Sequence, residues 1–351
     1  MSSAKKKIRV LIVDDSLFIR KLLKNILAAE EDIEIVGEAV DGLSGINEAE
    51  RLKPEVITMD YMMPHINGAD AVEHIMTAVR PPPAVVMVSA YTPAGSHALF
   101  RSLRSGAVDY ILKSSDDQVV DIDRFGRELV EKIRTAVVKH VVRHEPLPER
   151  SSRVKTQFVA HAKSVIAIGA STGGPPLLED IISSLPADFS GAVLVAQHMP
   201  KFFTSTFAER LNETSLLRVK EAKDGEEVQA GMVFIAPGDC SMEVRNGKIF
   251  LTHYPSSAQL LLPSIDTLMR SVAAEYGRRA IGVLLSGMGR DGVDGLSVLK
   301  GAGGHVIAQE LATTVVESMP ASAIMTGVVD EILDPTHITR RLIELTASYG
   351  R

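Results

Sequence analysis

Residues 164–180, "SVIAIGASTGGPPLLED", decide the fold of the second half of the chain. The apolar run at 165–168 predicts a buried strand, and the segment from Pro176 onward predicts a helix. The glycines between them predict a sharp strand-to-helix turn with Ser171 at the bend. A serine in such a turn can bind phosphate, act as a nucleophile or simply begin the helix.

The glycine-rich turn does not fit the nucleotide-binding motifs. A P-loop carries lysine and a hydroxyl residue after its second glycine, where this chain has Pro175 and Pro176. A dinucleotide fingerprint needs a glycine in place of Ser171 and an acidic residue about 20 positions later, and this chain has neither. Residues 169–173, "GASTG", do fit G-x-S-x-G, in which the serine hydroxyl is exposed. A nucleophile and an ordinary helix start both remain open at this point.

A nucleophilic serine needs a base and an acid that orients the base. Among ten histidines, His198 in "VLVAQHMP" directly follows a strong predicted strand of this half. Asp291 in "VLLSGMGRDG" follows another buried-looking strand, and Asp239 in "APGDC" is the second candidate for the acid. Because parallel strands end at one edge of a sheet, we predict that Ser171, His198 and Asp291 meet there.

The second half as a whole alternates strand and helix patterns, which predicts a doubly wound α/β domain. An Asn246-Gly247 pair between two alternating runs predicts a β-hairpin within residues 241–253. The expected strands are 164–171, 191–198, 232–239, 280–287 and 304–310.

The first half shows the same alternation and predicts a flavodoxin-like fold, a parallel five-stranded sheet with helices on both faces. Ser16 is the expected N-cap of its first helix. A helical pattern from about residue 120 then gives way to residues 143–164, which lack an apolar period and predict a linker. The expected strands are 8–13, 33–40, 54–60, 84–90 and 107–113.

Polar side chains stand at the ends of the predicted strands of the first half. They are Asp14, Asp15, Asp60, Ser89 and Lys113. Carboxylates crowded at one sheet edge repel one another and favour a hard divalent cation, which predicts Mg²⁺ binding. The ion and the lysine would also neutralise an incoming phosphate.

Composition limits the class of protein. The chain has 351 residues, 45% of them hydrophobic and 23% charged, which predicts two globular domains. The net charge of −6 argues against general nucleic-acid binding, and no helix-turn-helix pattern with a basic face is present. We expect no export signal, no disulfide for the single Cys240, no membrane insertion and a cytoplasmic location.

The motifs "VDDS", "TMDYMMP", "MVSA" and "DYILKSS" resemble the receiver domains of bacterial response regulators, in the family's order, over nearly all of residues 7–125. The resemblance implies phosphorylation by a histidine kinase with Mg²⁺ as cofactor. The implied roles are phospho-acceptor for Asp60, metal binding for Asp14, Asp15, Asp60 and the backbone carbonyl of Met62, phosphoryl contact for Ser89 and Lys113, and switch aromatic for Tyr110.

The motifs "IGASTGGP", "AQHMP" and "SGMGRDG" resemble the catalytic domain of the chemotaxis protein-glutamate methylesterases, from about residue 164 to 345. The resemblance implies hydrolysis of glutamate methyl esters on methyl-accepting chemotaxis receptors and deamidation of receptor glutamines, without a cofactor for ester hydrolysis. It also implies that the unphosphorylated receiver covers the catalytic cleft. The implied roles are nucleophile for Ser171, general base and acid for His198, tautomer-fixing acid for Asp291, and oxyanion stabilisation for Thr172 and the Met288 N–H.

Two stretches depart from the family pattern. "PGDCSM" stands where "PGGxHM" is expected, and Glu317-Ser318 stands where an aromatic-glycine pair is common. These departures motivate an alternative, a receiver-gated binding module without esterase activity. Retention of all three triad residue types favours the enzyme. The expected domains are the receiver at 1–125, a helix and linker at 126–162, and the catalytic domain at 163–351.

Overall fold

The structure is a computed structural model that describes residues 6–89, 93–113, 122–137, 161–254 and 261–350. The chain divides into two compact units, Met1–Pro146 and Leu147–Arg351. Most of the predicted linker, together with the end of the helical pattern before it, lies outside the described residues. Within these ranges, no helix has both the length and the apolar character needed to span a bilayer.

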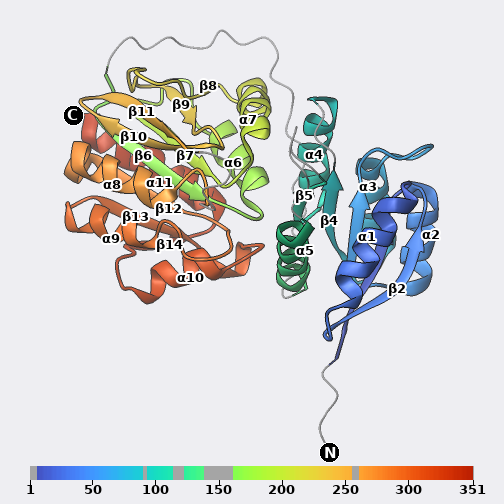
Figure 1. The fold of residues 1–351 in the computed structure, drawn as a ribbon. Coiled ribbons are helices and arrows are strands. Elements are labelled where there is room, and N and C mark those ends of the chain that lie inside the picture. Colours follow the sequence, from blue (N-terminus) through green and yellow to red (C-terminus); the bar gives the residue numbers. More distant parts are fainter. Residues whose placement is uncertain (1–5, 90–92, 114–121, 138–160, 255–260, 351) are drawn as a thin grey trace, which may run out of the picture. The chain divides into compact units, whose positions relative to one another are not determined.

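The first unit has a five-stranded sheet in the order β2-β1-β3-β4-β5, and every pair in it is parallel. Helices α1 and α5 contact each other on one face, while α2, α3 and α4 pack in a row on the other (Figure 1). The predicted flavodoxin-like fold is therefore confirmed. The bounds are β1 Ile8–Val13, α1 Leu17–Ala28, β2 Ile33–Ala39, α2 Gly42–Leu52, β3 Val56–Asp60, α3 Gly68–Ala78, β4 Ala84–Ser89, α4 Pro93–Ser105, β5 Asp109–Leu112 and α5 Ile122–Ala136.

The burial of the central strands and the start of the first helix agree with their sequences. Strands β3 and β4 are buried along their whole length, as expected for strands covered by helices on both faces. Ser16 caps α1, because its Oγ accepts a hydrogen bond from the N–H of Ile19 at 3.4 Å. The five strands end within one residue of their predicted ends.

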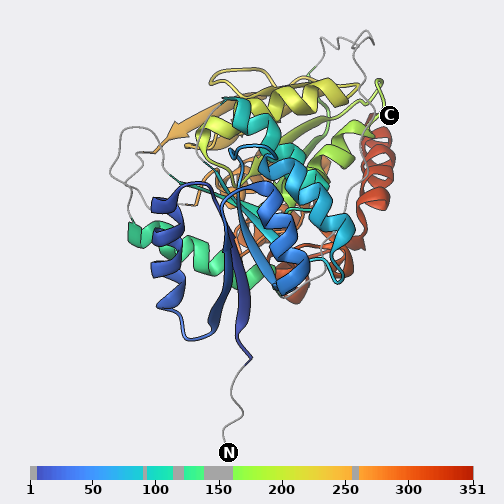
Figure 2. The same ribbon diagram turned by 90° about the vertical axis from the view of Figure 1, so that its right-hand side faces the viewer.

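The second unit has a seven-stranded parallel sheet in the order β14-β13-β12-β6-β7-β9-β8. Helix α6 contacts α7 and α11 on one face, and α9 contacts α8 and α10 on the other (Figures 1 and 2). The bounds are β6 Val165–Ala170, α6 Gly174–Ser183, β7 Ala192–Gln197, α7 Lys201–Thr214, β8 Arg218–Glu221, β9 Met232–Ile235, α8 Ile265–Tyr276, β12 Ala280–Leu284, α9 Val293–Gly301, β13 His305–Gln309, α10 Ser318–Met325, β14 Glu331–Leu333 and α11 Pro335–Gly350.

The five strands predicted for this unit are confirmed as β6, β7, β9, β12 and β13, whereas β8 and β14 were not predicted. Both are edge strands, with the sequences "RVKE" and "EIL". An edge strand pairs on one side only and buries little apolar surface, so its sequence need not show a strong hydrophobic pattern.

The predicted hairpin is confirmed as β10 Cys240–Arg245 and β11 Lys248–His253. Asn246 and Gly247 have φ angles of 52° and 69°, the left-handed conformation that a type I′ turn requires. The hairpin packs on α8, where the N–H of Val244 donates to Ser271 Oγ at 3.0 Å.

Candidate active site

The register of the second sheet places two candidate residues side by side. The last pair between β6 and β7 is Ala170 with Gln197. Ser171 and His198 follow these residues directly, and the N–H of His198 donates to the carbonyl of Ala170 at 3.0 Å. Pro175 stands in the first turn of α6, as predicted. The serine and the histidine therefore leave neighbouring strands at the same edge of the sheet.

The loop after β12, residues 285–292, lies on the other side of Ser171. The N–H of Ser171 donates to the carbonyl of Ser286 at 3.0 Å. A Cβ added to Gly287 would lie 2.8 Å from Ser171 Cβ and 2.1 Å from Met319 Sδ. The glycine therefore lets this loop approach the serine closely, which a larger residue would prevent.

Asp291, at the end of this loop, meets His198. His198 Nε2 lies 2.9 Å from Asp291 Oδ2. The carboxylate also accepts the N–H of Ile265 at 2.8 Å and the N–H of Asp266 at 3.0 Å, the first two residues of α8. A helix N-terminus stabilises negative charge, so three donors hold Asp291 in place.

These contacts determine which ring nitrogen of His198 is free. Burial raises the pKa of Asp291, but the bonds from His198 and the two backbone N–H groups outweigh it and leave that pKa below its usual value. An ionised carboxylate only accepts hydrogen bonds, so Nε2 carries a proton, and in the neutral imidazole Nδ1 therefore has the lone pair. Nδ1 is buried and has no hydrogen-bond partner among the described residues.

The alternative acid, Asp239, is bound elsewhere. Its carboxylate accepts from Lys201 Nζ at 2.7 Å and lies 3.3 Å from His253 Nδ1. Asp291 is thus the carboxylate that contacts His198. No hydrogen bond joins the Ser171 hydroxyl to His198 in the described part of the chain. Catalytic hydrogen bonds are often long or poorly aligned before substrate binds.

Two buried polar residues that sequence reasoning missed support the serine turn. Ser286 is fully buried, and its Oγ donates to the carbonyl of Thr172 at 2.8 Å and accepts from the N–H of Val316 at 2.9 Å. Gln197 Nε2 donates to the carbonyl of Ser171 at 2.9 Å. Both residues stand at or just after the carboxyl end of a strand. This position is the sequence signal that could have identified them as part of the site.

Met288 and Thr172, the predicted oxyanion residues, lie in the two segments that meet at Ser171. Thr172 is buried in the turn itself. Met288 lies in the loop after β12. Ser318 bridges this loop, because Ser318 Oγ donates to the carbonyl of Gly287 at 3.0 Å and accepts from the N–H of Gly289 at 3.0 Å. Ser318 belongs to one of the two unusual stretches, and it holds the backbone on both sides of Met288.

In the first unit, the predicted acidic group is also assembled. Side-chain oxygens of Asp14, Asp15 and Asp60 lie within 4.8 Å of one another. Lys113 Nζ lies 2.7 Å from Asp14 Oδ2 and 2.8 Å from Asp60 Oδ1. Burial raises the pKa of Asp60, Lys113 opposes that rise, and the charges of Asp14 and Asp15 add to it. Clustered carboxylate oxygens with excess negative charge fit Mg²⁺.

The remaining predicted receiver residues flank this group. Ser89 ends β4, and its carbonyl accepts from the N–H of Lys113 at 2.9 Å. Met62 follows β3 and is exposed. Tyr110 is buried in β5, with Lys132 Nζ 5.8 Å from the centre of its ring. Burial and the nearby Asp109 raise the pKa of Tyr110 well above its usual value.

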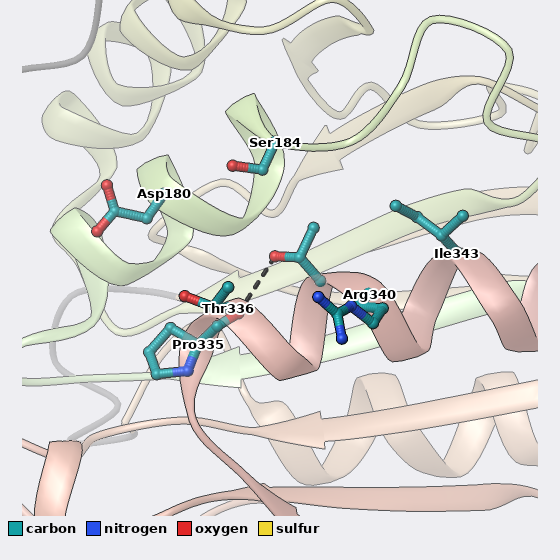
Figure 3. Close-up of a pocket in the computed structure, with 7 residues that line it drawn as sticks. Asp180, Ser184, Pro335, Thr336, Arg340 and Ile343 are labelled. Carbon is teal, nitrogen blue, oxygen red and sulfur yellow. Dashed lines mark hydrogen bonds between the residues drawn. The ribbon is translucent and has the colours of Figure 1, made fainter.

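A separate cavity of about 480 Å³ lies between α6 and α11. Figure 3 shows side chains from the end of α6 facing those of α11 across it. None of the predicted site residues lines this cavity, so it adds nothing to the Ser171 site. Its lining residues are Asp180, Ser184, Pro335, Thr336, Thr339, Arg340 and Ile343.

Comparison with known proteins shows the family to which the two units belong. Residues 166–342 match the family described as "CheB methylesterase", and residues 10–122 match "Response regulator receiver domain". Three relatives named protein-glutamate methylesterase/protein-glutamine glutaminase come from Methanococcus maripaludis, Thermotoga maritima and Pyrococcus horikoshii. They are 39%, 42% and 38% identical to this chain, covering 98%, 96% and 97% of it and 99%, 98% and 94% of their own lengths.

These relatives span both units, and their names describe enzymes. They therefore support the esterase interpretation and give no support to a binding module without activity. With a receiver domain in front of a catalytic domain that carries the Ser171, His198 and Asp291 arrangement, the chain belongs to the CheB methylesterase family.

Proposed function

We propose that this protein removes methyl esters from glutamate side chains of methyl-accepting chemotaxis receptors in the cytoplasm, and deamidates receptor glutamines by the same chemistry. The observation that carries the proposal is the His198–Asp291 hydrogen bond beside the strand end that bears Ser171. Family membership and the names of the relatives support the substrate class.

In the proposed reaction, Ser171 Oγ attacks the ester carbonyl carbon while His198 Nδ1 takes the hydroxyl proton. The resulting tetrahedral oxyanion collapses to a seryl ester, and His198 returns the proton to the leaving methoxide, which departs as methanol. Water, deprotonated by the same nitrogen, then releases the free glutamate side chain. Asp291 keeps the imidazole in the required tautomer and stabilises its cationic form.

The oxyanion would be stabilised by the Met288 N–H and by Thr172. Preorganised donors stabilise developing charge well because they need no reorganisation during the reaction. The buried Ser286 and the bridging Ser318 support this role, since they fix the two segments in which these donors lie.

In the receiver, we propose that Asp60 accepts a phosphoryl group from a histidine kinase. Asp14, Asp15, Asp60 and the Met62 carbonyl would hold Mg²⁺, and Ser89 and Lys113 would contact the phosphoryl oxygens. When bound, Mg²⁺ supplies positive charge that offsets those oxygens. The positions of Lys113 and the three carboxylates support this assignment.

We further propose a receiver at 1–125, a helix and linker at 126–162 and a catalytic domain at 163–351. Phosphorylation at Asp60 would then shift the protein from a state in which the receiver covers the catalytic cleft to one in which the cleft is open. Tyr110 would serve as the switch aromatic. Such a shift needs a difference of only a few kcal/mol in interaction free energy between the two states.

Methanol release tests the activity. Full-length protein is incubated with a radiolabelled, methylated cytoplasmic receptor fragment, Mg²⁺ and a small phosphodonor, and volatile label is counted. We expect release by the wild type and by Ser184→Ala, an exposed serine after α6, and background release by Ser171→Ala. Equal release by wild type and Ser171→Ala would overturn the assignment of the nucleophile, and no release by either would favour the binding module.

A further inference from the structure

A cluster of three different metal-binding side chains lies at the open end of the β10–β11 hairpin, outside the Ser171 site. Its members are Asp239, Cys240 and His253, called here the hairpin cluster. Cys240 and His253 are directly opposite each other in the antiparallel register. Side chains of such a pair lie on one face with Cβ atoms about 4.5–5.5 Å apart, so the fold itself brings the thiol and the imidazole together.

The donor atoms of the hairpin cluster are close to one another. Cys240 Sγ lies 3.0 Å from His253 Nδ1 and 3.3 Å from Asp239 Oδ1, and His253 Nδ1 lies 3.3 Å from Asp239 Oδ2. In a tetrahedral zinc site, with bonds of about 2.3 Å to sulfur and about 2.0–2.1 Å to nitrogen and oxygen, neighbouring donors are about 3.3–3.6 Å apart. Only a small opening of the cluster would admit an ion.

We infer that the hairpin cluster is a binding site for a thiolate-preferring divalent cation of the Zn²⁺ type, with Asp239, Cys240 and His253 as ligands and water in the fourth position. Sulfur and imidazole ligands select zinc and similar ions, whereas the all-carboxylate group in the receiver suits Mg²⁺. The two clusters therefore differ in the ions they prefer.

The exposure of the ligands gives the ion a path into the site. The Cys240 side chain is buried, while the His253 side chain is 62% exposed. Because zinc binds cysteine as the thiolate, metal binding forms the sulfur–metal bond and releases the thiol proton to solvent.

Lys201 is the competing cation at this site. Its Nζ donates to Asp239 Oδ2 at 2.7 Å, and its side chain is 56% exposed. A divalent ion that takes the Asp239 carboxylate would displace this ammonium into water. Removing Lys201 should therefore strengthen metal binding. If the cluster were only a hydrogen-bonded structural support, removing Lys201 would instead take away one of its hydrogen-bond donors.

The hairpin cluster is linked to the segment that follows His198. A Cβ added to Gly238 would lie 2.1 Å from the carbonyl oxygen of Met199 and 2.4 Å from the backbone N of Lys201. The backbone just before the cluster is therefore packed tightly against this segment. An ion bound to the hairpin cluster would therefore lie next to the chain segment that follows His198.

Cobalt titration of the full chain tests the site. The protein is stripped with a chelator, kept reduced without added thiol, and titrated with Co²⁺. Because Cys240 is the only cysteine, a sulfur-to-cobalt charge-transfer band in the near ultraviolet reports ligation at this position alone. We expect the band to saturate at one equivalent and to disappear when Zn²⁺ is added.

Variants complete the test. His253→Gln should weaken cobalt binding by more than about tenfold, since losing even an outer partner of a metal ligand costs about 10–100-fold. Lys201→Met should strengthen it several-fold. His337→Gln, an exposed histidine paired with Asp334 in the same unit, and Asp15→Asn in the receiver should leave the band unchanged. No band in the wild type, or equal affinity in His253→Gln, would overturn the inference.

Discussion

Asp291 binds the imidazole of His198 across the end of β6, a strand that contains neither residue. His198 follows β7 and Asp291 lies in the loop after β12, and β6, which Ser171 follows, lies between these strands. The loop therefore passes over the end of β6 to bring the carboxylate to the histidine. This crossing places the serine turn beside the His198–Asp291 pair.

Asp291→Asn should lower kcat for methyl-ester hydrolysis by on the order of a thousandfold or more, because an amide can donate to Nε2 and favour the wrong tautomer. Methanol release from the labelled receptor fragment measures the effect. Asp294→Asn is the matched control, since its carboxylate is 56% exposed and pairs with Arg290. A loss below tenfold in Asp291→Asn would show that the His198–Asp291 bond is not needed.

The same carboxylate should make stability depend on pH. Although burial raises its pKa, the bonds from His198, Ile265 and Asp266 lower it below the ordinary 3.8. A carboxyl group whose pKa is lowered by folding stabilises the fold at pH values above its ordinary, unfolded-state pKa. This contribution disappears as the pH falls through the pKa of the folded state. The Tm difference between wild type and Asp291→Asn should be large at pH 7 and shrink below about pH 4. A Tm difference that stays constant with pH would contradict a lowered pKa of Asp291 in the folded protein.

Asp60→Asn should raise the Tm of the receiver at pH 7 in the presence of a chelator. Burial, Asp14 and Asp15 raise the pKa of Asp60 above 3.8, so its ionised form destabilises the fold above the folded pKa. The gain in Tm should vanish as the pH falls towards the ordinary carboxyl pKa of 3.8. Mg²⁺ should stabilise the wild type more than the variant. Asp70→Asn, an exposed carboxylate paired with Arg101, is the control. A lower Tm for Asp60→Asn in chelator would argue against a strained acidic group.

Ser318→Ala should lower kcat about tenfold with little change in KM, because the loop around Met288 loses the hydroxyl that fixes it but keeps the N–H donor. Ser318→Thr retains the hydroxyl and should restore most of the rate. Ser322→Ala, one turn later in α10, should be near wild type. If Ser318→Ala raised KM instead, the residue would act on substrate binding and not on the oxyanion.

The strong strands made much of the proposed catalytic group predictable. Ser171, His198 and Asp291 each follow an apolar run, and parallel strands end at one edge, so their proximity followed from the pattern. The ring nitrogen that binds Asp291 could not be predicted, because it depends on the orientation of the imidazole in three dimensions.

Other features depend on contacts that sequence patterns do not encode. The roles of Ser286 and Ser318 come from single hydroxyls bridging segments that are distant in sequence. The pairing of Cys240 with His253, by contrast, follows from a two-residue turn at Asn246-Gly247, since the turn sets the register of the hairpin. The short edge strands β8 and β14 lack a pattern to reveal them.

The most direct measurement of the central claim is the rate of methanol release by Ser171→Ala, His198→Asn and the double variant, each as the full chain under phosphorylating conditions. Residues that act as one unit give losses that do not add. We expect the double variant to be no slower than either single variant. Independent, multiplicative losses would contradict a shared proton-transfer group of Ser171 and His198.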